Sequence, residues 1–201
     1  MKVIVITKSD KNGGLCVAGI NIENGSFVRL VSDNNTNHYA IPKWCMRNVE
    51  VLDIIDVSVI HPVPSFCQQE NMEVKLQQWT KVEKVPIETL FDKINNKDPY
   101  IFNDSCFYLD ESIAQSLQYS IIMVKVRDLI ISKNQYDKTK ASFLYNGVFY
   151  SNMSITDPDF YNIEGKFDNA ILVISIPDIG HSSDYYMERR CYKFVSKIYI
   201  I

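Results

Sequence analysis

Cations gather in the second half of the chain. Between Lys125 and Lys140 there are five cations and two anions, whereas residues 151–188 hold one cation and seven anions. Ammonium and guanidinium groups bind phosphates, and each phosphate contact makes binding more salt-dependent. If the strand around Lys125 and the C-terminal strand share one barrel, Lys125, Arg127 and Lys193 line one phosphate-binding groove. The alternative is an ordinary solvated strand face.

Two tyrosines flank the Asn146-Gly147 turn in the same region. Nucleic-acid bases stack on aromatic rings, and each stack contributes about 1–3 kcal/mol. We predict that Tyr145 and Tyr150 are exposed, because a phenolic hydroxyl favours contact with water. The alternative is that these rings pack in the core, as alternate residues of a strand do.

The most polar cluster follows the Pro62-Val63-Pro64 break and contains Gln69, Glu70 and Asn71. Side-chain amides read base edges, and a carboxylate accepts a hydrogen bond from an exocyclic amine or a ribose hydroxyl. The cluster therefore suits a nucleotide pocket, or it braces a buried junction by satisfying backbone groups. Lys8 and Arg29, on predicted strands of the first half, complete the candidate binding residues.

The sequence patterns that would indicate catalysis are weaker than those that indicate binding. The three histidines lie in predicted loops without a nucleophile elbow, and the glycines after Ser9 lack the lysine of a phosphate-binding loop. Asp157-Pro158-Asp159 predicts a turn closed by an aspartate side chain more readily than a cation site. We therefore predict a protein that is not an enzyme, with no cofactor and no metal.

The elements that must position these residues are strands. The chain of 201 residues has 43 Ile and Val against 15 Leu and Ala, and β-branched residues favour strands over helices. Apolar residues at Ile87, Leu90, Phe91 and Ile94 have helical spacing and predict one short helix. A second short helix is expected to follow Asp110. The fold class is mainly β with minor α.

The two halves repeat one plan. Asn24-Gly25 and Asn146-Gly147 each predict a hairpin, and each half offers a leading strand, that hairpin and a further long strand. A series of this size fits a small barrel. We predict a first barrel over residues 1–85, a connector with a short helix over 86–119 and a second barrel over 120–201.

Net charge and hydropathy narrow the class further. The formal charge of −3 with 22% charged residues is typical of a globular protein, so a nucleic-acid surface must be local. No apolar run approaches the roughly 18 residues of a membrane span, and the five cysteines form no metal-binding or disulfide pattern. We expect a cytoplasmic protein with no membrane contact.

Several stretches together resemble the dual OB-containing domain family of bacteria, often written DuOB. They are Cys16-Val17-Ala18-Gly19, Phe27-Val28-Arg29-Leu30-Val31, Val51-Leu52-Asp53-Ile54-Ile55, Gln69-Glu70-Asn71, Ile155-Thr156-Asp157-Pro158 and Cys191-Tyr192-Lys193-Phe194-Val195-Ser196-Lys197-Ile198. The resemblance implies two OB-like barrels packed together. It also implies binding of nucleic acid or nucleotides in systems that defend bacteria against phage.

Two functions follow as hypotheses. The first is a non-catalytic module that binds single-stranded nucleic acid or a nucleotide-type ligand through Lys8, Arg29, Lys193 and Tyr145 among others. The second is a scaffold subunit that recruits an effector enzyme through exposed strand edges and the polar cluster around Gln69. The overall negative charge suits the second at least as well.

Overall fold

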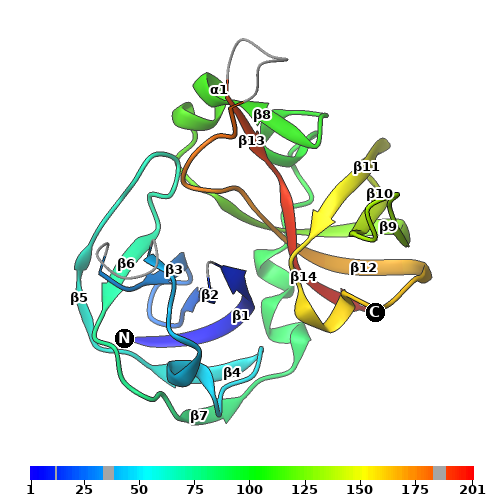
Figure 1. Cartoon of the computed structure of the whole chain (residues 1–201). Helices are drawn as coiled ribbons and strands as arrows, with labels where there is room; N and C mark the ends of the chain where they lie inside the picture. The colour runs from blue at the N-terminus through cyan, green and yellow to red at the C-terminus, as the bar shows by residue number, and fades with distance from the viewer. Residues whose placement is uncertain (12, 34–38, 183–188) are drawn as a thin grey trace. The chain divides into compact units, whose positions relative to one another are not determined.

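A computed structural model of the chain describes residues 1–11, 13–33, 39–182 and 189–201. The chain forms two compact units (Figure 1). Unit 1 comprises residues 1–65 and 69–92, and unit 2 comprises residues 66–68 and 93–201.

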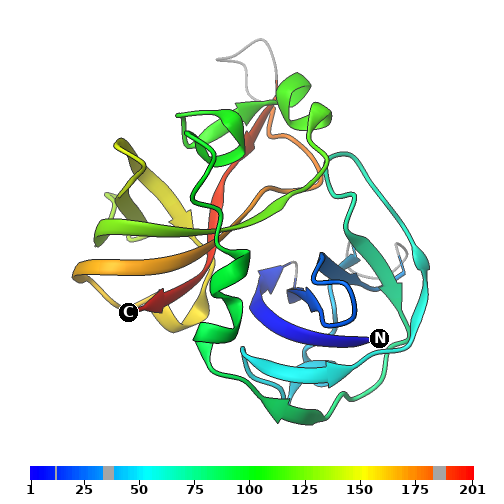
Figure 2. The same ribbon diagram turned by 180° about the vertical axis from the view of Figure 1, so that it is seen from behind.

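Unit 2 contains a closed barrel of five strands, β9 (Ile121–Lys133), β10 (Thr139–Tyr145), β11 (Val148–Ile155), β12 (Gly165–Ser175) and β14 (Phe194–Ile200). Around the barrel the order is β9, β10, β11, β14, β12 and back to β9. All neighbours are antiparallel except β11 and β14, which are parallel. Figure 2 shows β9 and β12 running side by side. In an OB barrel, three strands form a meander, and a fourth and a fifth strand close the barrel with the fifth parallel to the third. The second barrel has this Greek-key arrangement.

Two bulges bend the β9–β10–β11 meander. Ser142 of β10 lies opposite two residues of β11, Ser151 and Asn152, and Asn152 has a left-handed backbone (φ 58°). Asp128 of β9 takes the same conformation (φ 53°) beside a second register shift. An extra residue bends the strand and increases its twist, which helps a short sheet to close on itself.

One end of this barrel is filled by the chain that precedes it. Residues 93–120 contain the 3-10 turn η4 (Ile101–Asn103), strand β8 (Tyr108–Asp110) and helix α1 (Glu111–Ser116). Phe102 and Leu109 belong to the same hydrophobic core as the barrel residues Phe143 and Leu172. β8 pairs with β13 (Arg190–Tyr192), which lies between β12 and β14 in the chain.

Unit 1 repeats the barrel with one strand interrupted. Its sheet runs β5, β6, β3, β2, β1, β4, β7, and β3 and β6 are parallel. The bounds are β1 (Lys2–Lys11), β2 (Gly14–Asn21), β3 (Phe27–Val31), β4 (Asp53–Asp56), β5 (Val59–Pro62), β6 (Asn71–Val74) and β7 (Lys81–Lys84). The sheet curls until β4 and β5 meet as two halves of one strand, separated only by Val57 and Ser58.

The ladder continues through this interruption. The Val57 amide donates to the Met1 carbonyl (2.9 Å), and the Lys75 amide donates to the Ser58 carbonyl (2.9 Å). The split strand therefore bridges β1 and β6, as the fourth strand bridges its two neighbours in unit 2. The described part of unit 1 also contains the 3-10 helix η2 (Lys43–Met46), most of η3 (Ile87–Lys93) and the buried Trp79.

The predicted fold class is confirmed, since both units have the strand order of an OB barrel. Both predicted hairpins form, and Gly25, Asn146 and Gly147 have the positive φ that such turns need. The helix predicted from the spacing of apolar residues after Ile87 forms at the predicted position, but it is a 3-10 helix and not an α-helix. The helix after Asp110 is α1, although the Asp110 side chain makes no capping hydrogen bond. No helix among the described residues is both long enough and apolar enough to cross a membrane.

Strand β1 lies so close to Gly19 of β2 that no side chain fits there. A Cβ atom built there would lie 2.2 Å from Val3 Cγ1 and 2.4 Å from the Ile4 carbonyl oxygen. We predict that Gly19→Ala lowers the free energy of unfolding by about 1–3 kcal/mol, the usual cost of overpacking. The matched control is Gly165→Ala, whose Cβ meets nothing closer than 3.6 Å. Equal urea midpoints for the two variants would contradict this view of the β1–β2 contact.

Candidate functional site

The outer surface of β10 and β11 is the open face of unit 2, and we call it the β10–β11 face. Side chains alternate along a strand, so burial of Ala141, Phe143 and Tyr145 leaves Lys140, Ser142 and Leu144 outside. On β11 the ring of Phe149 is 59% exposed. In the loop between β9 and β10, Tyr136 is 72% exposed. This strand pair and this loop are the elements with which OB barrels bind oligonucleotides.

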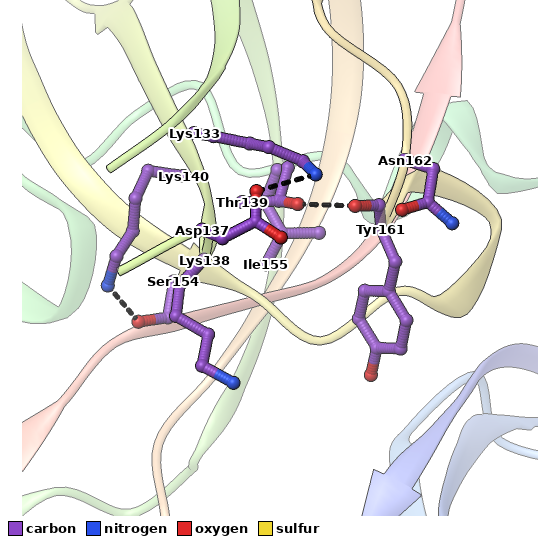
Figure 3. Close-up of a pocket in the computed structure, with 9 residues that line it drawn as sticks. All are labelled: Lys133, Asp137, Lys138, Thr139, Lys140, Ser154, Ile155, Tyr161 and Asn162. Atoms are coloured by element: carbon purple, nitrogen blue, oxygen red, sulfur yellow. Dashed lines mark hydrogen bonds and ion pairs between the residues drawn. The ribbon is translucent and has the colours of Figure 1, made fainter. Parts of the chain in front are cut away.

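A pocket of about 420 Å³ lies at the end of this face where β9 passes into β10 (Figure 3). Its lining carries three ammonium groups, from Lys133, Lys138 and Lys140, and one carboxylate, from Asp137. Lys133 and Asp137 form an ion pair at 2.8 Å, so the other two ammonium groups give the pocket its positive charge. An anion such as a phosphate suits this lining.

Lys140 joins this pocket to a second one. Its Nζ donates to the Ser154 hydroxyl at 2.7 Å, a neutral partner that leaves the positive charge uncompensated. Partial burial lowers the pKa of the Lys140 ammonium. Lys140 and Ser154 also line a neighbouring pocket of about 320 Å³, which extends towards Phe107 and Tyr192. The two pockets therefore lie on either side of this one lysine.

Lys125 and Arg127 are exposed on β9, as the sequence predicts for binding residues. Arg127 lies opposite Leu144 in the β9–β10 ladder, and Leu144 lies opposite Phe149 in the next ladder. The guanidinium of Arg127 thus comes from the row of residues that carries the exposed Phe149 ring. Lys125 lies two residues before Arg127 on β9.

The predicted exposure of Tyr145 and Tyr150 is wrong, because both are buried. The Tyr145 hydroxyl lies 3.1 Å and 3.0 Å from the carbonyl oxygens of Asn95 and Asp98. The Tyr150 hydroxyl accepts from the Ile101 amide and donates to the Asp104 carbonyl, each at 2.9 Å. The backbone of residues 95–104 thus takes the place of water, and burial raises the pKa of Tyr150 to about 12.

Lys193 is also buried rather than placed in the groove. Its Nζ donates to the carbonyl oxygens of Ile101 and Asp104, both at 2.7 Å, and lies 5.4 Å from the centre of the Tyr150 ring. The Asp104 carboxylate is 4.0 Å away. Burial lowers the pKa of Lys193 to about 8, because carbonyl dipoles replace hydration only in part.

In unit 1 the predicted cations are engaged within the fold. Lys8 donates to the Val49 carbonyl (2.6 Å) and pairs with Glu50 (2.9 Å). Arg29 is 3% exposed, donates to Cys16 Sγ (2.8 Å) and pairs with Glu70 (3.5 Å). Both side chains therefore make contacts that stabilise the first barrel.

The polar cluster after the proline break divides in the structure. Gln69 is exposed, Glu70 holds Arg29, and Asn71 is buried as the first residue of β6. Gln68, which precedes Gln69, donates from its side-chain amide to the Ile176 carbonyl at 3.2 Å within unit 2. Gln68 thus satisfies a backbone carbonyl and Glu70 pairs with a side chain of the first barrel, whereas a ligand contact of Gln69 stays a prediction.

The two barrels differ on the face that binds ligands in OB folds. On β2 and β3, which correspond to β10 and β11, the outward residues Ala18, Ile20 and Arg29 are buried, and Cys16 and Phe27 are half-buried. Ile20 and Ala18 are apolar, so this face offers no open row of cations and rings among the described residues. Of the two barrels, the second carries the open strand face.

Asp157 and Asp159 form the predicted turn. The Asp159 amide donates to Asp157 Oδ1 at 3.2 Å. Both carboxylates accept from Lys197 Nζ, at 3.1 Å and 2.5 Å, so the cation at this turn is a lysine of β14. Burial raises the pKa of Asp157.

Sequence reasoning did not select the residues that line the face itself. Lys133, Lys138 and Lys140 lie in the basic stretch, and Phe149 precedes Tyr150. Adjacent strand residues point to opposite faces, so only one of Phe149 and Tyr150 is available to a ligand. Because Tyr150 pairs with the buried Phe143, Tyr150 points into the core and the ring available to a ligand is that of Phe149.

Two OB barrels in one chain define the protein as a dual OB protein. The chain belongs to the family described as the dual OB-containing domain, whose model matches residues 1–198. The predicted family is thereby confirmed, and the match spans both barrels.

No curated protein matches the sequence. Among solved structures, one of a murine DNA-binding protein bound with double-stranded DNA matches with 10% identity, covering 100% of this chain and 97% of that chain. Its TM-score is 0.37, which does not establish a common fold.

The burial of Lys193 predicts a pH dependence of stability. Its pKa is 10.5 when hydrated and about 8 in the fold, so between these values the unfolded chain binds more protons than the folded chain. Stability then rises with pH across this window and is lowest, for this group, below pH 8. The free energy of unfolding of the wild type minus that of Lys193→Met should increase from pH 8 to pH 10.5. Denaturant unfolding at several pH values measures it, and a flat or falling difference would contradict the assignment.

Proposed function

We propose that this protein is a non-catalytic binding module that holds single-stranded nucleic acid on the β10–β11 face of its second barrel. The observation that carries the proposal is the coincidence of two features on that face. The pocket lined by Lys138 and Lys140 lies on the strand pair and loop that bind oligonucleotides in OB barrels. Exposed rings of Tyr136 and Phe149 lie on the same elements.

Charge and rings have separate roles in this proposal. The ammonium groups of Lys138 and Lys140 neutralise phosphates, whatever the sequence of the strand. The rings stack on bases, which are accessible in a single strand and inaccessible between the pairs of a duplex. The overall charge of −3 fits a local site of this kind better than a broad duplex-binding surface. A role in bacterial defence against phage stays a prediction from the family resemblance.

A second candidate function, the recruitment of an effector protein, is favoured by the edge of the sheet in unit 1. Strand β7 stands at the end of the strand order and all four of its residues are exposed, with Val82 at 56%. An open strand edge accepts an added strand from a partner. This function would be favoured if the protein captures a partner, if Lys138→Gln with Lys140→Gln leaves that capture unchanged, and if Val82→Lys abolishes it.

Neutralising the pocket tests the electrostatic part of the proposal. We expect Lys138→Gln with Lys140→Gln to weaken binding of a fluorescent single-stranded oligonucleotide at low salt. The slope of log affinity against log salt should also become shallower by about 0.7 for each phosphate that the variant no longer neutralises. Lys84→Gln, an exposed lysine of β7, is the control for charge alone. An unchanged slope in the double variant, or no wild-type binding to DNA or RNA at low salt, would overturn the proposal.

Removing the exposed ring tests the stacking part. Phe149→Ser should reduce affinity for the single strand by about 5- to 100-fold, because one base stack contributes about 1–3 kcal/mol. Phe91→Ser, which removes a ring of unit 1 that is 47% exposed, should leave affinity unchanged. Fluorescence anisotropy at fixed salt measures both. Equal affinities of the two variants would show that Phe149 does not stack on the ligand.

A further inference from the structure

The second pocket of unit 2 differs in chemistry from the lysine-lined pocket beside it. It has a volume of about 320 Å³, at the lower end of the roughly 300–1,000 Å³ of small-ligand sites. Four of its lining residues have rings, Phe107, His181, Tyr192 and Phe194. The others are polar, Lys140, Asn152, Ser154 and Lys193. We call it the aromatic pocket.

The rings are arranged around Tyr192. The Phe107 ring is stacked with that of Tyr192 at 6.0 Å between centroids, and the His181 ring meets it edge-on at the same distance. Tyr108 supports Tyr192 from another side at 6.2 Å, and the Arg190 guanidinium lies over the Tyr108 ring at 4.2 Å. Phe107 is 39% exposed, so part of its surface is open to a flat ligand.

A bulge residue provides one of the polar side chains of this pocket. Asn152 has a left-handed backbone inside strand β11, at the bulge opposite Ser142. Its amide N–H donates to the Ser142 hydroxyl at 3.2 Å, which fixes the bulge. A bulge re-aims a side chain, and asparagine is one of the residues that adopt a left-handed backbone most readily. Here it places an exposed amide at the wall of the aromatic pocket.

We propose that the aromatic pocket takes one unstacked base of the bound strand and that Asn152 reads the edge of that base. This inference rests on the proposed function. The base lies against the open surface of Phe107, and the Asn152 amide both donates to and accepts from its polar edge. Lys140, shared by both pockets, contacts the phosphate that joins this nucleotide to the part of the strand over Lys138. The pocket therefore gives the module a sequence preference at one position.

The test compares single strands of about six nucleotides, within the roughly 4–16 nucleotides that one OB barrel covers. The probes are fluorescent hexamers of A, C and T in DNA and of A, C and U in RNA, measured by anisotropy at low salt. The wild type should prefer one base by about 5-fold or more, the lower limit for one bidentate amide contact. Asn152→Gly should lose this preference, and Phe107→Leu should lower affinity for the preferred hexamer.

Two controls distinguish a loss of base recognition from a loss of stability and from a loss of positive charge. Asn152→Gly removes the amide where glycine adopts the backbone without strain, so its melting temperature should equal or exceed that of the wild type. Lys138→Gln should weaken binding to every hexamer by the same factor and keep the preference.

Several outcomes would overturn the inference while the proposed function stands. One is a wild type that binds all hexamers equally, and another is a preference that survives in Asn152→Gly. Tighter binding of a free nucleoside monophosphate than of the hexamer with the same base would overturn the assignment to a strand. If the wild type binds no hexamer at all, the proposed function fails instead.

Discussion

The hydrogen bonds of the buried Lys193 amino group are the interaction that joins the second barrel to residues 101–104 at its end. Its Nζ holds the carbonyl oxygens of Ile101 and Asp104, and the Tyr150 hydroxyl binds the backbone of the same two residues. These bonds attach residues 101–104 to the end of the barrel, where Phe102 joins the core. The Lys193 amide also donates to the Phe107 carbonyl at 2.9 Å. Since Tyr192 and Phe194 flank Lys193, this residue positions three of the four rings of the aromatic pocket, those of Phe107, Tyr192 and Phe194.

Much of the fold follows from local pattern. Asn146-Gly147 closes a two-residue hairpin between Tyr145 and Val148, because both of its residues accept positive φ. The excess of Ile and Val marks the strands, since branched side chains fit a pleated surface. The interruption of the fourth strand at Val57 was not predicted, because β-branched residues continue on both sides of it, at Ile54-Ile55 and at Val59-Ile60.

The site was predictable only in part, and the errors have a common cause. Whether a cation or a phenol faces water depends on contacts made far along the chain. Lys193 binds carbonyl groups 92 and 89 residues away, and Tyr150 binds the amide 49 residues away. Nothing near Lys193 in the sequence distinguishes it from the exposed lysines. Composition does locate the basic stretch correctly, and Lys125 and Arg127 are exposed on the barrel as expected.

The two barrels share one topology and differ in what their second and third strands present. Outward residues of β2 and β3 are buried or half-buried, whereas those of β10 and β11 include the half-buried Lys140 and the exposed Phe149 and Asn152. The proposed binding site therefore lies on the second barrel. The most direct measurement is an amide NMR titration of the full chain with a short single-stranded oligonucleotide. We predict shifts that map to β10, β11, the β9–β10 loop and residues 192–194. Shifts confined to β2 and β3, or none at low salt, would contradict the assignment.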